Sequence, residues 1–156
     1  MTVSRRIRLT WVGSGESVVA QMLDDEAPQV CEMIWQMLPI EHKSIHGQFS
    51  GAEVFVLLDR PRPAPRENLT QLPLPGELLY FFDEGGAVTS GSRQAAEICL
   101  IYHRGVVLRG PEGVPTHANL FARIPGDWKY DWPEFAAACR SVRHTGPKVL
   151  RLERVE

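Results

Sequence analysis

The sequence predicts a mainly β fold, either a barrel or a closed antiparallel sheet, on three observations. Short runs of apolar or alternating residues recur along the chain, and Gly- or Pro-rich turn signals separate them. Two isolated segments show the spacing of amphipathic helices instead. The connections between the runs are short, so we expect antiparallel pairing rather than βαβ units.

The strand signals begin near the N-terminus with a hairpin. Ile7, Leu9 and Trp11 alternate with polar residues, and a second extended run over 17–22 follows the Gly-rich turn at 13–15. Prolines between 61 and 75 remove backbone donors and exclude a central strand there. The remaining predicted strands are apolar or alternate with charge: 54–58, 78–82, 98–102, 120–124 and 149–155.

The two helix signals differ in their start and stop residues. The first helix is expected after the acidic pair at 24–25, with Pro28 in its first turn and Pro39 at its end. The second is expected over 133–143, where the acidic residues at 131 and 134 have a capping-box spacing. We expect both helices to pack an apolar stripe against the sheet.

Size and charge exclude several classes of protein. The chain has 156 residues, a net charge of −2 and a pI near 6.2. Its length fits one domain, 1–156, because domains are typically roughly 100–200 residues long. It lacks the clustered basic face of a nucleic-acid-binding protein, and it has neither a signal core nor an apolar run of membrane-spanning length. We therefore predict a soluble cytoplasmic protein without nucleic-acid or membrane partners.

The cysteines predict free thiols rather than a metal site. Cys31, Cys99 and Cys139 are far apart, odd in number and embedded in apolar sequence. No CxxC or Cys/His spacing is present, so neither a zinc site nor a cofactor is expected. Buried free thiols fit a reducing cytoplasm.

Two polar runs beside strand candidates, 46–51 and 67–70, mark a candidate site, because loop residues on a rigid scaffold often carry function. His46 is a candidate general acid or base, since imidazole titrates near pH ~6.5; a hydrogen bond to a neighbouring loop explains it equally well. Glu67 could pair with His46 or organise the Pro-rich loop. His46 and Glu67 are the predicted catalytic residues.

Further side chains are predicted to contact a ligand. Each also has a structural interpretation: a polar group that holds a turn, an aromatic ring in the core, or, for Glu97, a carboxylate that faces solvent. These predicted ligand-binding residues are Gln48, Ser50, Asn68, Thr70, Tyr80, Glu97, Tyr102, Asn119 and Phe121.

The order of these motifs resembles that of a known family. The motifs are the hairpin, the Asp-rich turn, Ala-Pro and the first helix, then Leu38-Pro39, His46, Ser50-Gly51, Glu67-Asn68, Pro75-Gly76, Asn119 and Phe121. From about Ile7 to Leu152, the chain resembles an uncharacterised bacterial family with a cyclophilin-like β-barrel. The resemblance implies a closed antiparallel barrel of roughly eight strands with two helices capping its ends, and room for a small pocket. It brings no established activity.

The same resemblance argues against prolyl isomerase activity. Cyclophilins use an Arg in a Phe-His-Arg-like strand, followed by a Gln. The corresponding run, 41–49, contains His and Gln but no Arg. A group that would polarise the imide is therefore missing, and fold alone does not imply function.

The sequence leaves three functions open. The first is binding of a small polar metabolite (an amide, imide or carboxylate) at the barrel rim, with hydrolase- or isomerase-type acid/base chemistry as an extension. The second is a non-catalytic protein or peptide interaction module, with self-association into a homo-oligomer left open. Prolyl isomerase activity ranks last. The Gly- and Ser-rich stretch over 83–93 is expected to be a loop that could close over the pocket.

Overall fold

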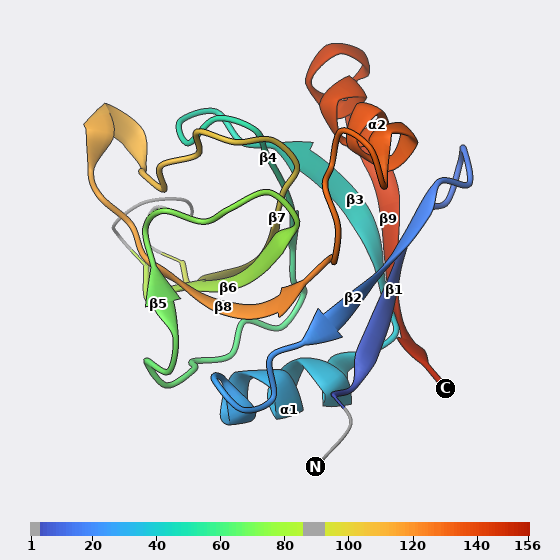
Figure 1. Cartoon of the computed structure of the whole chain (residues 1–156). Coiled ribbons are helices and arrows are strands. Elements are labelled where there is room, and N and C mark those ends of the chain that lie inside the picture. The colour runs from blue at the N-terminus through green and yellow to red at the C-terminus, as the bar shows by residue number, and fades with distance from the viewer. Residues whose placement is uncertain (1–3, 86–92) are drawn as a thin grey trace.

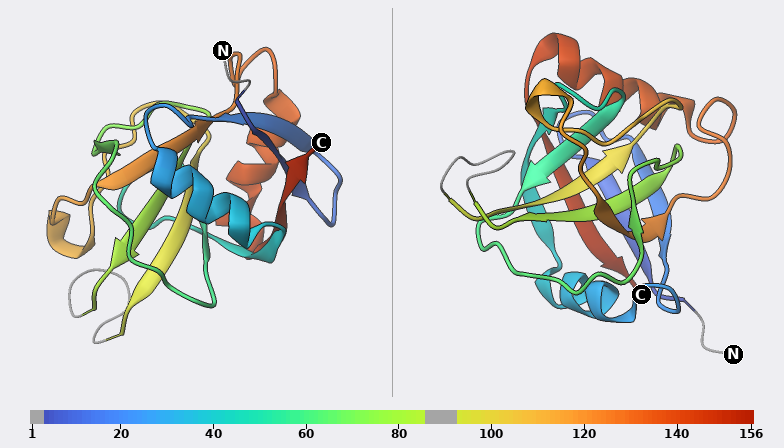
Figure 2. Two further views of the ribbon diagram at one scale, coloured as in Figure 1. Left: turned by 90° about the horizontal axis from the view of Figure 1, so that it is seen from below. Right: turned by 90° about the vertical axis from the view of Figure 1, so that its left-hand side faces the viewer.

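Antiparallel strands form a closed barrel, and one helix lies at each end of it (Figures 1 and 2). The computed structural model describes residues 4–85 and 93–156. Its elements are β1 (Arg6–Trp11), β2 (Ser17–Met22), α1 (Pro28–Met37), β3 (Ile40–His46), β4 (Glu53–Leu57), β5 (Leu69–Thr70), β6 (Glu77–Asp83), β7 (Ala95–Ile101), a 3₁₀ turn (Pro111–Gly113), β8 (Ala118–Arg123), α2 (Pro133–Thr145) and β9 (Lys148–Val155).

The barrel closes through the pairing of β2 with β8. The strand order is β2-β1-β9-β3-β4-β7-β6-β8, and Met22 pairs with Ala122 to complete the ring. The two-residue strand β5 pairs with the first residues of β8, next to this junction. The predicted barrel of about eight antiparallel strands with two helices is confirmed.

Alternate residues of β4, β6 and β7 face opposite sides of the sheet, because successive side chains of a strand point in opposite directions. One set, which includes Val54, Tyr80 and Leu100, packs into the barrel core. The other set faces outward, and the segment 105–118 covers it. Leu79, Cys99 and Ile101 form an outer cluster there with Val106, Leu108 and Ala118. In Figure 2, right, this gold-to-orange segment passes in front of β6 and β7.

The helices form where the sequence places them, but their predicted caps are wrong. The N-cap of α1 is Ala27, which makes no side-chain cap, and Asp24 instead accepts a hydrogen bond from the Arg5 guanidinium at 2.6 Å. Trp132 is the N-cap of α2, and Asp131 accepts from the backbone N–H of Asp127 at 2.6 Å. Folding offers each carboxylate another donor, so neither caps its helix.

Two strands were not predicted, β3 and the two-residue β5. β3 pairs with β4 and β9, although five of its seven residues are polar or charged. His46 is its last residue, so the polar run 46–51 begins on a strand and not in a loop. Asp83 belongs to β6, and most of the loop predicted over 83–93 lies outside the described residues. Within the described ranges, no helix is long and apolar enough to cross a membrane.

Candidate functional site

A cavity of about 280 Å³ lies on the outer face of β4, β6 and β7, beneath the covering segment 105–118. Most of its wall is apolar, and the apolar lining residues include Phe49, Phe55, Leu57, Phe81, Leu108 and Ala118. Its polar lining residues are His46, Gln48, Ser50, Glu53, Glu97, Arg109 and Thr116. The cavity thus combines an apolar body with a few polar groups, as small-molecule sites do.

Two glutamates form the polar floor of this cavity. Glu53 opens β4, and Glu97 lies on the neighbouring strand β7, where it pairs with Leu57 and Phe81. The register places both carboxyl groups on the outward side of the sheet, with Cys99 between them. Glu53 is 7% exposed and Glu97 is 5% exposed. The Cys99 thiol donates to Oε1 of Glu97 at 3.6 Å, whereas Oε2 of Glu97 is buried without a hydrogen-bond partner among the described residues.

Burial raises the pKa of both glutamates at the cavity floor. It raises the pKa of Glu53 to about 7, since the charged form loses its hydration. Burial, and then the nearby Glu53 and Asp83 charges, raise the pKa of Glu97 to about 8. Near neutral pH, the two carboxyls therefore hold protons that exposed glutamates would lose. One can donate a proton while the other accepts one.

Cys99 is a poor nucleophile in this environment. Its thiol is almost completely buried, and burial together with the two glutamate charges raises its pKa. The thiolate, which is the reactive form of cysteine, is thereby disfavoured. Cys99 acts here as a weak hydrogen-bond donor between the two carboxyls.

His46 borders the cavity, but its ring faces the barrel interior. It pairs with the core residue Val54, and its Nε2 lies 2.6 Å from the Tyr102 hydroxyl. Nδ1 lies 2.8 Å from the Gly47 carbonyl, which can only accept, so this network assigns the proton to Nδ1 and lets Tyr102 donate to Nε2. Burial is the main cause that lowers the pKa of His46. Both ring nitrogens are thus engaged in a neutral imidazole.

Ser50 fastens the cover of the cavity. Its Oγ accepts from the Arg109 backbone N–H at 3.1 Å and lies 3.2 Å from the Arg109 carbonyl, to which it donates. Its own carbonyl accepts from Val107 at 3.2 Å. The side-chain amide of Gln71 also donates a hydrogen bond to the Leu108 carbonyl at 3.1 Å. These bonds hold the covering segment over the carboxyl pair, and Gln48 lines the cavity beside them.

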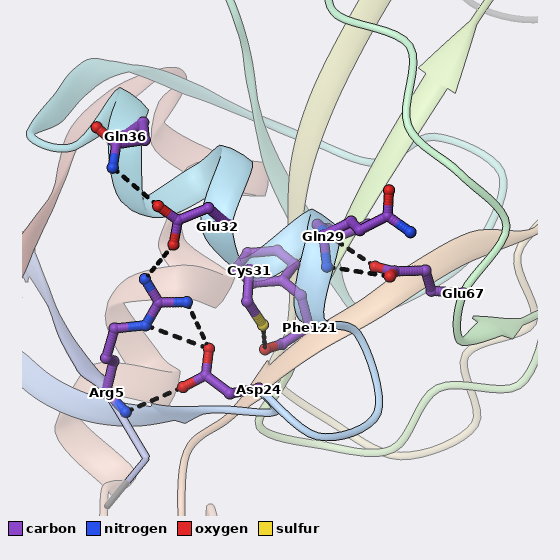
Figure 3. Close-up of polar contacts among 9 residues, drawn as sticks. Arg5, Asp24, Gln29, Cys31, Glu32, Gln36, Glu67 and Phe121 are labelled. Atoms are coloured by element: carbon purple, nitrogen blue, oxygen red, sulfur yellow. Dashed lines mark hydrogen bonds and ion pairs between the residues drawn. The ribbon is translucent and has the colours of Figure 1, made fainter. Parts of the chain in front are cut away.

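Glu67 lies at the N-terminus of α1, and the described cavity does not include it (Figure 3). Its carboxylate accepts from the backbone N–H of Gln29 at 3.0 Å and of Val30 at 2.8 Å. Helix N-termini carry unpaired donors and a partial positive charge, which a carboxylate satisfies. This contact replaces the cap that the residues before α1 do not supply.

Asn68 and Asn119 organise the chain around Glu67. Oδ1 of Asn119 accepts from the backbone N–H of both Glu67 and Asn68, each at 3.0 Å, and its amide donates to Pro65 at 2.9 Å. The Asn68 amide donates to Leu120 at 3.0 Å. Their hydrogen-bonding groups thus hold β8 against the Pro-rich connection.

The remaining predicted residues fill structural positions. Thr70 accepts from the Leu72 backbone N–H at 3.0 Å. Tyr80 packs in the barrel core and exchanges hydrogen bonds with the Arg62 backbone, and Phe121 is fully buried in the same core. The structure therefore brings Gln48, Ser50 and Glu97 to one cavity, with His46 at its border. It places Glu67, Asn68, Thr70 and Asn119 at the other polar run, away from the cavity wall.

Sequence reasoning missed Glu53 and Cys99. The signal for Glu53 was a carboxylate at the start of an apolar strand, in Glu53-Val-Phe-Val, and Cys99 lies in the apolar run that follows Glu97. Glutamates are rarely buried without a partner, so their burial becomes informative only once the covering segment is in place. The described residues contain no group of three or more His, Cys, Asp or Glu side chains arranged to hold a metal ion.

Comparisons with known proteins identify a matching family model and solved structures with a similar fold. A family model described as a protein of unknown function (DUF3830) matches residues 9–154. The structure of McbB in complex with tryptophan superimposes with a TM-score of 0.66 at 19% identity, over 95% of this chain and 44% of that one. The solution structure of the hypothetical protein AF2241 from Archaeoglobus fulgidus superimposes with a TM-score of 0.55 at 15% identity, over 99% of this chain and 98% of that one.

These likenesses have defined limits. At such low identities, the two solved structures show a shared fold alone, and this chain spans less than half the length of the McbB chain. No curated protein matches the chain. The expected membership in a family of unknown function is confirmed. The cyclophilin-like and bacterial character of that family stays a prediction.

Proposed function

The chain belongs to this family of unknown function, and on the chemistry of the cavity we propose that it binds a small molecule there, with Glu53 and Glu97 as an acid/base pair. The observation that carries the proposal is the buried carboxyl pair, with one oxygen of Glu97 left without a partner among the described residues. A buried acceptor without a partner costs free energy, which a ligand donor would recover.

The carboxyl pair supports acid/base chemistry because its pKa values lie near physiological pH. With pKa values of about 7 and about 8, one carboxyl can be ionised while the other is protonated. General acids and bases work best when their pKa lies near the operating pH. We assign this role to Glu53 and Glu97; the catalytic role predicted for His46 and Glu67 stays a prediction.

The lining favours a ligand with an apolar body. Phe49, Phe55 and Phe81 contribute aromatic surface, while the polar groups gather at the floor and at Arg109. An amide or imide group fits the floor, since a protonated and an ionised carboxyl offer one donor and one acceptor. A ligand carboxylate fits only near Arg109. McbB was solved in complex with tryptophan, so we choose a molecule with an aromatic body as the first probe.

A protein-interaction module remains the second candidate, and one observation favours it. Leu72 and Leu74, in the connection between β5 and β6, are 64% and 63% exposed. Exposed apolar residues in one loop are typical of contact surfaces. Prolyl isomerase activity ranks last because the run around His46 has no Arg.

A ligand screen followed by mapping tests the proposal. Thermal shift with small amides, imides, amines and carboxylates should identify compounds that add roughly 2.7 kcal/mol of stability at ~100 times their dissociation constant. NMR of methyl-labelled protein should then show the largest shift changes at Leu108 and Ala118, which line the cavity. The proposal fails if no compound stabilises the protein, or if the shifts gather around Leu72 and Leu74 instead.

Catalysis needs a separate readout. Each bound compound is incubated with the wild type and with the Glu53→Gln and Glu97→Gln variants, and products are followed by NMR. We expect turnover to disappear in both variants, since the amide cannot exchange the proton. Turnover that survives in both would remove the acid/base role but keep the binding role.

A further inference from the structure

The charged groups at the cavity floor are all acidic. Glu53 and Glu97 face the cavity, and Asp83 on β6 lies close enough for its charge to raise the pKa of Glu97. Among the described residues, no ion pair includes Glu53 or Glu97. Arg109 lines the cavity from the covering segment but is exposed to solvent. His46 on β3 directs its ring to Tyr102 and is held neutral.

The floor also has an open acceptor. Glu97 is more than nine-tenths buried, faces the cavity, and its Oε2 has no hydrogen-bond partner in the described structure. The neighbouring thiol of Cys99 already donates to the other oxygen. A ligand that donates hydrogen bonds and carries positive charge would satisfy this oxygen and also supply the missing counter-charge.

The walls suit the same kind of group. Phe55 and Phe81 lie on strands β4 and β6, on either side of Glu97 and Cys99. Aromatic faces attract cations, and more strongly when both are removed from water. A cavity of about 280 Å³ is at the small end for a ligand site, which favours a body about the size of a single ring.

We propose that the group held at Glu53 and Glu97 is the protonated amine of a small molecule with an apolar, single-ring body. This inference rests on the proposed function and names its ligand class. The ammonium donates to Oε2 of Glu97 and to the Glu53 carboxyl, and the phenylalanines enclose the body. A ligand carboxylate at this floor would face the two buried glutamates. An uncharged amide would supply no counter-charge to their ionised forms.

Three probes with one phenylethyl skeleton separate these classes: phenethylamine, 3-phenylpropionamide and 3-phenylpropionate. Calorimetry at about pH 7 should show that phenethylamine binds at least about tenfold more tightly than the other two. Binding should release protons, because the ammonium ionises carboxyls that burial keeps protonated. Titrations in buffers of different ionisation enthalpy measure this release on the wild type, without any variant.

Variants then locate the contact. Glu97→Gln keeps the shape and removes the ionisable group, so phenethylamine should lose about tenfold in affinity while the amide changes little. Glu26→Gln is the matched control, since Glu26 is exposed and does not line the cavity. Proton uptake on binding, or an unchanged affinity in Glu97→Gln, overturns the amine contact.

The two proposals fail in different ways. If the amide or the carboxylate binds most tightly and perturbs Leu108, the amine inference is wrong and the small-molecule proposal stands. If none of the three probes perturbs Leu108 or Ala118, the amine inference is overturned, and the broader screen decides the proposed function by itself.

Discussion

Glu67 and Val30 are 37 residues apart in the sequence and are joined by a 2.8 Å hydrogen bond from the Val30 backbone N–H to the Glu67 carboxylate. With the second bond to Gln29, this contact satisfies two of the donors at the start of α1 (Figure 3). The Pro-rich connection is thereby tied to the helix that closes one end of the barrel. A residue in a loop, predicted as part of an active site, stabilises a helix in the structure.

Replacing Glu67 should therefore cost stability. We expect Glu67→Ala to lower the free energy of unfolding by about 1–2 kcal/mol, because two helix N-terminal donors lose their acceptor. Urea denaturation measures the change, and Glu26→Ala, an exposed glutamate next to the same helix, serves as the control. Unchanged stability with a loss of ligand binding or turnover would instead support the catalytic role predicted for Glu67.

The buried glutamates should make stability fall as pH rises. Their folded-state pKa values of about 7 and about 8 lie above the ordinary value of 4.5, so the folded state holds more protons than the unfolded state in this interval. Their contribution is complete below pH ~4.5 and is lost as pH rises through the folded-state pKa values, at most by roughly 1.4 kcal/mol per pH unit and per group.

Denaturation curves between about pH 5 and pH 8 test this window. The Glu53→Gln/Glu97→Gln double variant should show a flatter profile than the wild type, since its amides do not titrate. An equally steep fall in the double variant would place the titrating groups elsewhere and contradict the raised pKa values.

Gly47 should be sensitive to a single added methyl group. A Cβ built at this position lies 2.7 Å from Oε1 of Glu53 and 3.4 Å from the Glu53 carbonyl. Gly47→Ala should push the Glu53 carboxyl out of place and weaken ligand binding by about tenfold or more, with a smaller effect on stability. Gly13→Ala is the matched control, because a Cβ there meets nothing within 4 Å. Equal affinities in the two variants would argue against Glu53 as a contact.

His46 and Tyr102 should behave as a structural pair. Tyr102→Phe removes the donor to Nε2 of His46 and should lower stability by about 1–3 kcal/mol, since a buried acceptor is left unpaired. NMR titration of the imidazole should give a pKa below 6.5, because burial favours the neutral ring. A pKa at or above 6.5 would mean that the ring is hydrated or paired with an acid.

The resulting pH dependence is opposite to that of the glutamates. The unfolded state binds more protons at His46 than the folded state does below pH ~6.5, so this group adds stability as pH rises and loses it as pH falls. Tyr102→Phe/His46→Gln should remove that acid-side loss, as denaturation near pH 5 would show.

Local sequence patterns predicted part of the candidate site, whereas the rest depends on segments that are distant in the sequence. Gln48 and Ser50 were predicted from the polar run 46–51, and Glu97 from its place just before an apolar strand. The three residues meet at one cavity. Glu53 was missed, because a glutamate at the start of a strand is usually exposed. Its burial comes from the segment 105–118, which folds over the outer face of the sheet about fifty residues later in the chain.

The sequence by itself determined most of the barrel and both helices, because turn residues, alternation and helical spacing act over a few neighbouring residues. It missed β3 and the two-residue β5, whose places depend on their partner strands rather than on their own patterns. Only the tertiary structure decided the roles of the carboxylates. Glu67 became a helix cap and Glu97 a buried acid because burial and donor geometry depend on segments that are distant in sequence.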